Sequence, residues 1–409
     1  MGAVAGARRP SRRSHLHSFV RRPAMADIMR GDMTTNVAPQ RVGFLDHFRG
    51  IAILAVFLLH AFNLSFGNAA GIPQAITPEF LLRQIPVLLR SFSEAGVPIF
   101  FVVSGFCIHM SYQQQGRRWG TFFVRRFFRI YPPYFFAVLL FTFIYPLTRF
   151  DIIRGWRQLA WHLLLLHNLK SGASAGINPA FWSIGVEVQL YLLYPLLLLL
   201  VARLGWRRTL SGLALLELGM RAACIVRPGL FAACWFSGSP LFFWFSWSLG
   251  AALADAFLQG RPLPLIKFSP GLWAVLAAGS YYVQPLEPLV FPFFAVLTAI
   301  IFGRILTGAW PRFHAPQFCR DHLRITGICS YSIYLLHQPL MAAIPGPLHS
   351  WFSGAVSPLL VYLTCVLSWL AIMPLGWLWY RFGELPSIAC GKRIIRKWMD
   401  RSGSAVPIA

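Results

Sequence analysis

The ionisable residues Asp46, Arg49 and His60 lie along an otherwise apolar stretch of the chain at residues 44–62. Arg49 and His60 are 11 residues apart, which is about three helical turns or roughly 16 Å of rise. This spacing brings the two side chains to within about 20° of each other around a helix, so they share one face. Asp46 precedes Arg49 by one turn and can pair with it. Ionisable groups in a membrane segment are costly and usually face a polar interior, so this face predicts a functional site.

Two further titratable residues are expected at a similar depth. Glu187 lies near the start of the apolar run 180–203, and His337 lies near the end of the run 324–344. Titratable groups that converge from separate spans are typical of an active site in an apolar bundle. Glu187 could instead hold the bundle together through hydrogen bonds, and His337 could satisfy a helix end.

A cluster of arginines opens the apolar run at residues 130–148. Arg125 and Arg129 are spaced to share one face of a helix, with Arg126 beside them. Guanidinium groups bind phosphates through planar, bidentate hydrogen bonds, so the cluster could hold a phosphate-bearing ligand. The simpler interpretation is that these cations only orient the helix, because Lys and Arg are enriched in cytoplasmic loops.

The composition is that of a helical protein with many membrane crossings. Of the 409 residues, 56% are hydrophobic and only 12% are charged, which is more apolar surface than a water-soluble domain needs. The net charge of +24 does not indicate nucleic-acid binding, because Lys and Arg collect in short loops and at the N-terminus. The seven cysteines include no C-x-x-C pair, so we expect neither a metal site nor a disulfide framework.

Apolar runs follow one another at residues 44–66, 94–112, 130–148, 156–169, 180–203, 209–226, 231–257, 271–285, 289–307, 324–344 and 355–381. The run at 156–169 is short for a crossing and is expected to form a re-entrant or interfacial helix. If the other ten runs span, the basic loops and both termini fall on the cytoplasmic side. The sequence therefore predicts an all-α, polytopic membrane bundle of about ten transmembrane helices.

Residues 1–40 are rich in Arg, Ser and Pro and contain no apolar run. We expect a disordered, basic cytoplasmic tail there rather than a signal peptide. The transmembrane domain is expected at residues 41–386 and a basic cytoplasmic C-terminal tail at residues 387–409.

Five motifs, in order along the chain, resemble those of the bacterial integral-membrane acyltransferase-3 family, whose members O-acylate carbohydrates and related acceptors. They are LDHFRGIAILAVFLLH (45–60), FFVVSGF (100–106), RRFFRIYPPY (125–134), FWSIGVEVQLYLLYP (181–195) and YSIYLLHQP (331–339). Arg49 and His60 match the R-x10-H motif of that family, in which the histidine is the catalytic residue. Pro98 stands where the family often has an acid, so an acidic role does not carry over to that position. The chain ends at Ala409, which resembles the stand-alone form of the family.

The resemblance implies a bacterial inner-membrane enzyme that moves an acyl group, most simply acetyl, from cytoplasmic acyl-CoA to a hydroxyl of a cell-surface or lipid-linked carbohydrate. His60 would take the hydroxyl proton. Arg49, held in position by its ion pair with Asp46, would orient His60 or the donor. Glu187 would orient the acceptor or tune His60. The remaining expected contacts are Arg125, Arg126 and Arg129 with the donor phosphates, and Trp182, Tyr334 and His337 with the acceptor.

Other interpretations fit part of the same pattern. A proton-coupled transporter or flippase of a lipid-linked sugar would also place His and Glu inside the membrane. An enzyme of the same fold could instead acylate a small cytoplasmic metabolite, with the acceptor entering from the other face. Ser104 lacks the G-x-S-x-G context of a nucleophile and is expected to be a packing residue.

Overall fold

The computed structural model describes residues 38–67, 90–144, 152–310, 316–344, 347 and 356–401. Every regular element within these ranges is helical, in agreement with the predicted all-α fold. The expected N-terminal tail lies outside the described residues, except for its last positions, where the first helix begins.

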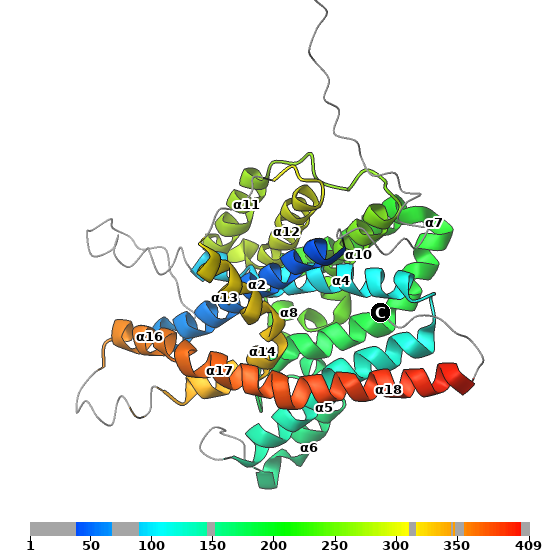
Figure 1. Ribbon diagram of the computed structural model, residues 1–409. Helices are drawn as coiled ribbons and strands as arrows, with labels where there is room; N and C mark the ends of the chain where they lie inside the picture. Colours follow the sequence, from blue (N-terminus) through cyan, green and yellow to red (C-terminus); the bar gives the residue numbers. More distant parts are fainter. Residues whose placement is uncertain are drawn as a thin grey trace, which may run out of the picture.

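The helices carry the labels of Figure 1. The first half comprises α2 (Ala38–Phe66), α4 (Gly96–Gln114), α5 (Trp119–Phe143), α6 (Ile152–Leu163), η1 (His167–Leu169), η2 (Pro179–Phe181) and α7 (Trp182–Val226). The middle comprises α8 (Gly229–Ala232), α9 (Cys234–Ser237), η3 (Pro240–Phe243), α10 (Trp244–Leu258), α11 (Pro270–Tyr282), η4 (Gln284–Leu289) and α12 (Val290–Leu306). The last part comprises α13 (Gln317–Ile328), α14 (Ser330–Ala342), α16 (Pro358–Leu367), α17 (Trp369–Trp379), η5 (Tyr380–Glu384) and α18 (Leu385–Arg401).

Six helical segments of the described chain are long and apolar enough to cross a membrane. They are Phe44–Phe66, Arg90–Gln114, Pro179–Val226, Pro240–Leu258, Gln284–Leu306 and Pro358–Asp400. These segments agree with a multi-pass membrane bundle, whereas the predicted number of ten spans is not confirmed. Two of the six are 48 and 43 residues long, although about 20 residues suffice for one crossing.

Helix breaks explain why the number of spans predicted from apolar runs differs from the number of long apolar helices in the structure. Gly205 has φ 75° and ψ 162°, so α7 is two helices joined at a kink, and glycine adopts this left-handed φ without a steric cost. The predicted span 324–344 is divided between α13 and α14 at Cys329. Helix α6 has only 12 residues, about 18 Å at 1.5 Å per residue, which is too short for a crossing.

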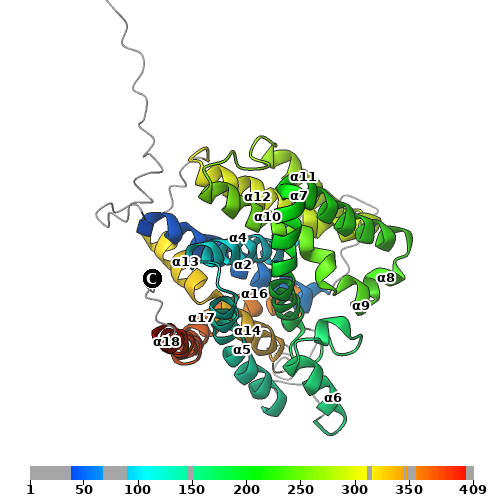
Figure 2. The same ribbon diagram turned by 90° about the vertical axis from the view of Figure 1, so that its right-hand side faces the viewer.

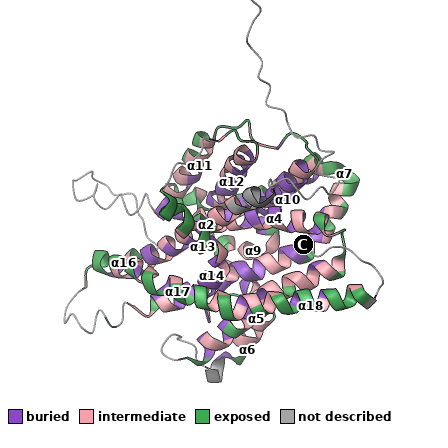
Figure 3. Ribbon diagram, viewed as in Figure 1, coloured by how far each residue is buried: buried purple, intermediate pink, exposed green. Residues whose placement is uncertain are grey.

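Helices α4 and α10 lie at the centre of the bundle and are largely buried (Figure 3). A Cβ atom at Gly105 would lie 2.1 Å from the carbonyl oxygen of Trp247, and one at Gly250 would lie 1.9 Å from that of Val102. Small residues at these positions let the two backbones touch, as is common between membrane helices. The contact also brings Trp247 Nε1 to Ser104 Oγ, to which it donates at 3.3 Å.

Helix α2 passes through the middle of the bundle and contacts α4, α13, α14 and α16. Seen in the rotated view, α2 and α4 lie centrally, with α11 and α12 on one side and α5 and α6 on the other (Figure 2). A Cβ atom at Gly327 of α13 would lie 1.7 Å from the carbonyl oxygen of Asp46. This close approach places the charged part of α2 in the interior of the protein.

The helices α16, α17 and α18 run end to end along one side of the molecule (Figure 1). The outer surface of α16 and α17 is apolar, with Leu370 at 74% exposure, as expected for a face in contact with lipid, whereas α18 exposes several lysines and arginines. Helix α18 continues without a break through the expected boundary at residues 386–387, and residues 402–409 lie outside the described chain.

Candidate functional site

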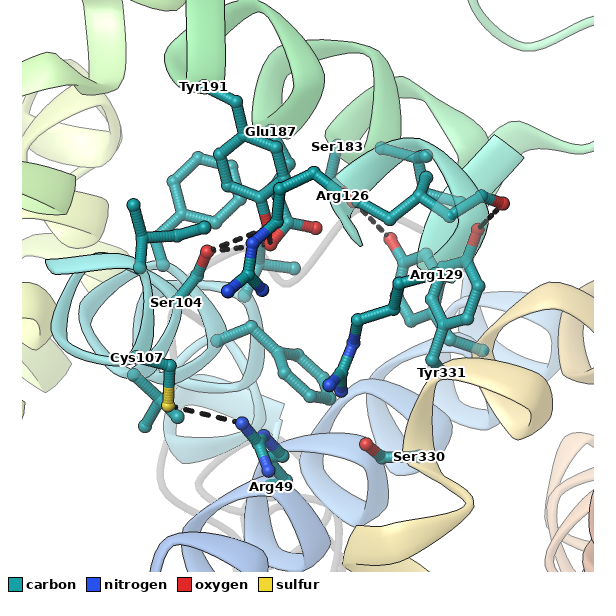
Figure 4. A pocket seen from close by; sticks show the side chains of 18 residues that line it. Arg49, Ser104, Cys107, Arg126, Arg129, Ser183, Glu187, Tyr191, Ser330 and Tyr331 are labelled. Atoms are coloured by element: carbon teal, nitrogen blue, oxygen red, sulfur yellow. Dashed lines mark hydrogen bonds between the residues drawn. The ribbon is translucent and has the colours of Figure 1, made fainter. Parts of the chain in front are cut away.

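A cavity of about 90 Å³, the arginine cavity, lies inside the bundle between α2, α4, α5, α7 and α14 (Figure 4). Its charged lining consists of Arg49 from α2, Arg126 and Arg129 from α5, and Glu187 from α7. The sequence predicted a functional role for each of these four residues, and the fold brings them to one place from three separate helices.

Arg49 is held in position from two directions. Its Nη1 donates to Asp46 Oδ1 at 2.9 Å, which is the pairing expected from their spacing. Its Nη2 lies 3.2 Å from Cys107 Sγ on α4. The ion pair and the contact with α4 fix the guanidinium at the edge of the cavity, at the end of α2 opposite to His60.

Two hydroxyl groups hold the Glu187 carboxylate. Ser104 Oγ donates to Glu187 Oε1 at 2.7 Å, and the Tyr191 hydroxyl, one turn further along α7, donates to the same oxygen. Ser104 in turn accepts a hydrogen bond from Trp247. The expectation that Ser104 only fills space is therefore wrong, because it links α4, α7 and α10 through a polar network.

The cationic lining comes from the first half of α5. The guanidinium groups of Arg126 and Arg129 point into the cavity (Figure 4). Neither group forms a hydrogen bond or an ion pair with another residue of the described chain, and Arg126 Nε is buried without a partner. Enclosed donors that the protein leaves unsatisfied are suited to binding a negatively charged ligand atom.

A π-helical turn at Tyr380–Glu384 interrupts the last long helix and turns Glu384 into the interior. Such turns are frequent at functional sites. Ser332 Oγ donates to Glu384 Oε2 at 2.9 Å, and Glu384 is the acid that acts most strongly on Arg129. Glu384 thus offsets part of the arginine charge without lining the cavity itself.

Tyr334 connects the cavity to His60. It lines the cavity, and its hydroxyl donates to the carbonyl oxygen of Ala180 at 2.7 Å. The ring centroid of His337 lies 5.4 Å from that of Tyr334 and 5.2 Å from that of His60. His337 Nδ1 lies 2.9 Å from the Tyr334 carbonyl oxygen, and since a carbonyl only accepts, this nitrogen carries the proton. The other ring nitrogen of His337 is buried without a partner.

Five of the predicted residues lie outside the lining of this cavity: Asp46, which pairs with Arg49, His337, which contacts Tyr334, and His60, Arg125 and Trp182. His60 is separated from it by Tyr334 and His337. Arg125 does not line it, so Arg126 rather than Arg125 shares the cavity with Arg129. Trp182 lines a second cavity of about 290 Å³.

Glu384 is an interior acid close to the arginine cavity that the sequence did not single out. It follows the last apolar run, and its inward position depends on a π-turn that has no sequence period of its own. The available signal was the residue type alone, a carboxylate next to a long apolar segment. Within the described residues, no group of three or more His, Cys, Asp or Glu side chains could hold a metal ion.

Known proteins resemble this chain over much of its length. Acyltransferase MdmB of Streptomyces mycarofaciens is 27% identical over 362 residues, which cover 80% of this chain and 87% of that protein. Peptidoglycan O-acetyltransferase OatA of Listeria monocytogenes is 24% identical over 350 residues, which cover 75% of this chain and 50% of that protein. An uncharacterized protein of Haemophilus influenzae is 34% identical over 119 residues, or 25% of this chain and 48% of that protein.

No solved structure shows a significant match to the chain. The profile of one protein family, described as "Acyltransferase domain", matches residues 42–380. This range includes all five motifs and every residue that lines the arginine cavity. The chain therefore belongs to the acyltransferase-3 family of membrane proteins, as its motifs indicated.

Proposed function

We propose that the protein transfers an acyl group, acetyl in the simplest case, from cytoplasmic acyl-CoA to a carbohydrate hydroxyl at the opposite face of the bacterial inner membrane, with both termini cytoplasmic. Membership of the family supports acyl transfer. The observation that supports the proposal most directly is the pair Arg126 and Arg129, which donate no hydrogen bond to the described chain, in a cavity whose lining residue Tyr334 contacts His337. The His337 ring in turn contacts His60.

The arginine cavity would receive the acyl end of the donor. Its lining combines three arginines with the serine and tyrosine hydroxyls around Glu187, which suits the polar thioester group. Arg126 and Arg129 would then stabilise the negative charge that develops on the thioester oxygen. The phosphates would stay nearer the start of α5, within reach of Arg125.

In the proposed reaction, the acceptor hydroxyl attacks the thioester carbonyl carbon while His60 takes the hydroxyl proton. A carbon–oxygen bond forms, the carbon–sulfur bond of the tetrahedral intermediate breaks, and His60 returns the proton to the leaving thiolate. His337 would act as a positioning residue, because its unprotonated nitrogen is available to orient the neighbouring His60 ring. Glu187 would hold the Arg126 charge in place.

The test supplies labelled acetyl-CoA to the cytoplasmic side of membranes that contain the protein and measures labelled carbohydrate. We expect His60→Ala to lower transfer by about 10²–10⁴-fold, the usual contribution of a general base, while the protein inserts normally. His322→Ala is the matched control, since that histidine lies on α13 and stacks only on Phe318.

Transfer at the wild-type rate by an inserted His60→Ala variant would contradict the assignment of the base. Sugar export by the wild-type protein without any labelled product would instead favour the proton-coupled transporter.

A further inference from the structure

The second cavity lies at the end of the bundle where α4, α7 and α12 begin. Packed aromatic side chains separate it from the arginine cavity. Phe101 lines the arginine cavity, and its ring centroid lies 5.6 Å from that of Phe243 and 5.4 Å from that of Phe291, both of which line the second cavity. The two cavities are therefore separated by two layers of aromatic rings in direct contact.

The arginine of the second cavity is already occupied by the protein. Arg221 donates from Nε and Nη2 to Glu217, from Nη2 to the Phe242 carbonyl oxygen at 2.7 Å, and from Nη1 to the Pro288 carbonyl oxygen. Four of the five N–H groups of a guanidinium are thereby used, and Glu217 balances its charge. Arg221 has little capacity left to bind an anionic ligand.

The other charged side chains that line the second cavity are acidic, and they have fewer hydrogen-bond partners than Arg221. Glu94 and Glu287 both line it. Glu94 has one cationic neighbour, Arg90, at 3.6 Å. Glu287 is exposed, and its carboxylate forms no hydrogen bond with another residue of the described chain. The free polar groups of this cavity are thus hydrogen-bond acceptors with negative charge.

We infer that the second cavity binds the acceptor of the acyl group, and that this acceptor is a neutral or positively charged sugar rather than an acidic one. The inference rests on the proposed function, because it takes the occupant of the second cavity to be the acceptor of that reaction. The flat faces of Trp182, Phe243 and Tyr281 suit the C–H face of a sugar ring. Carboxylates accept hydrogen bonds from hydroxyl and ammonium groups, whereas an acidic sugar would meet Glu94 and Glu287 with no free cation.

Two native cysteines make the inference testable without an activity assay. Cys234 lines the second cavity and Cys107 lines the arginine cavity. Replacing the exposed Cys319 and Cys390 by serine leaves only buried cysteines besides these two. The thiols are then labelled with thiosulfonate reagents of similar size and opposite charge, and the rates are divided by those of a free thiol.

We expect Cys234 to favour the cationic reagent several-fold and Cys107 to favour the anionic one, because the two cavities differ in the sign of their free charges. The double variant Glu94→Gln/Glu287→Gln should bring the ratio at Cys234 back to that of the free thiol and leave Cys107 unchanged. Equal ratios at the two cysteines, or a ratio at Cys234 that ignores the two substitutions, would overturn the inference.

The occupant is tested by protection, with glucosamine, N-acetylglucosamine and glucuronate as probes. We expect the first two to slow labelling of Cys234 and glucuronate to have no effect, with Cys107 insensitive to all three. Protection by glucuronate, or by none of the sugars, would overturn the inference. Acyl transfer without protection leaves the proposed function standing, and protection without acyl transfer refutes the proposed function while the sugar site stands.

Discussion

The two cavities both contain arginine, and the protein treats it in opposite ways. In the second cavity, Arg221 is buried with a carboxylate and two carbonyl oxygens around it, and its guanidinium lies 4.2 Å from the ring centroid of Phe242. In the first, Arg126 and Arg129 point into the cavity without a hydrogen bond to a carboxylate or carbonyl oxygen of the described chain. A buried arginine is therefore not in itself a sign of function. The number of its donors left unsatisfied distinguishes a structural role from a ligand-binding one.

This difference has an energetic meaning. An enclosed cation with unsatisfied donors destabilises the folded protein until a ligand or water satisfies it. A buried ion pair with complete hydrogen bonding is close to neutral overall, but the loss of one partner is strongly destabilising. The two kinds of arginine should thus respond in opposite ways to truncation.

Truncation of the unpaired arginines should have the largest effect on activity. We expect Arg126→Ala and Arg129→Ala each to lower kcat by about 10²–10³-fold, as for the removal of one oxyanion donor. The thermal midpoint in detergent should be unchanged or raised in Arg126→Ala, whereas Arg129→Ala should also lower it, because buried Glu384 loses its nearest cation. Arg125→Ala is the matched comparison on the same helix, and we expect it to raise KM for acetyl-CoA and to spare kcat. Initial rates against acetyl-CoA concentration separate these outcomes.

If Arg126→Ala lowered the amount of folded protein in parallel with activity, its role would be structural and the contrast with Arg221 would fail. Equal losses of kcat in all three variants would show that Arg125 acts in the same way as Arg126 and Arg129, although it does not line the cavity.

Truncation of Arg221, whose N–H groups are almost all hydrogen-bonded, should have the largest effect on stability. We expect Arg221→Ala to destabilise the protein by about 3–5 kcal/mol, because Glu217 is left as an unpaired buried charge. The double variant Arg221→Met/Glu217→Leu should recover much of that loss. Thermal unfolding in detergent measures both, and Arg227→Ala, at an exposed position just beyond the end of the same helix, should change stability by less than about 0.5 kcal/mol. A double variant no more stable than Arg221→Ala would argue against the ion pair as the cause.

The sequence was sufficient to predict the helical membrane fold and most of the charged lining. Arg49, Arg126, Arg129 and Glu187 could be selected because an ionisable residue in an apolar run is informative by type alone. The pairing of Asp46 with Arg49 followed from their spacing. These predictions depend on local rules, which a single helix is enough to satisfy.

The rest of the site depends on how helices are rotated and broken, which local spacing does not determine. Spacing alone gave no reason to place Arg126 in the cavity and Arg125 outside it. Glu384 faces inward only because of a π-turn, and the number of spans depends on breaks at Gly205 and Cys329. The saturation of Arg221 involves carbonyl oxygens from distant segments, so no sequence pattern could have shown it.

A pair of buried histidines outside both cavities should make stability depend on pH. This effect is smaller, and it measures the cost of burying an ionisable group where no ligand binds. His162 and His167 stack with ring centroids 4.2 Å apart and planes 9° apart, and both are fully buried. Neither lies in a candidate span. Burial lowers the pKa of His162 to about 4, and burial together with the charge of His162 lowers the pKa of His167 to about 3.

The unfolded chain binds protons at these histidines near pH 6.5, whereas the folded protein does not bind them until the pH approaches 4. The contribution of the two neutral histidines to the free energy of unfolding is therefore complete above pH 6.5 and is lost as the pH falls towards 4. We expect acidification from pH 7 to pH 5 to cost about 1–2 kcal/mol for each histidine. In detergent, His167→Asn should therefore show a shallower fall in the thermal midpoint with pH than the wild type. Because Arg221→Ala leaves both histidines in place, it should keep the wild-type pH slope at a lower midpoint. An unchanged slope in His167→Asn would mean that the ring is already protonated in the folded protein, and burial would then not be the dominant influence on it.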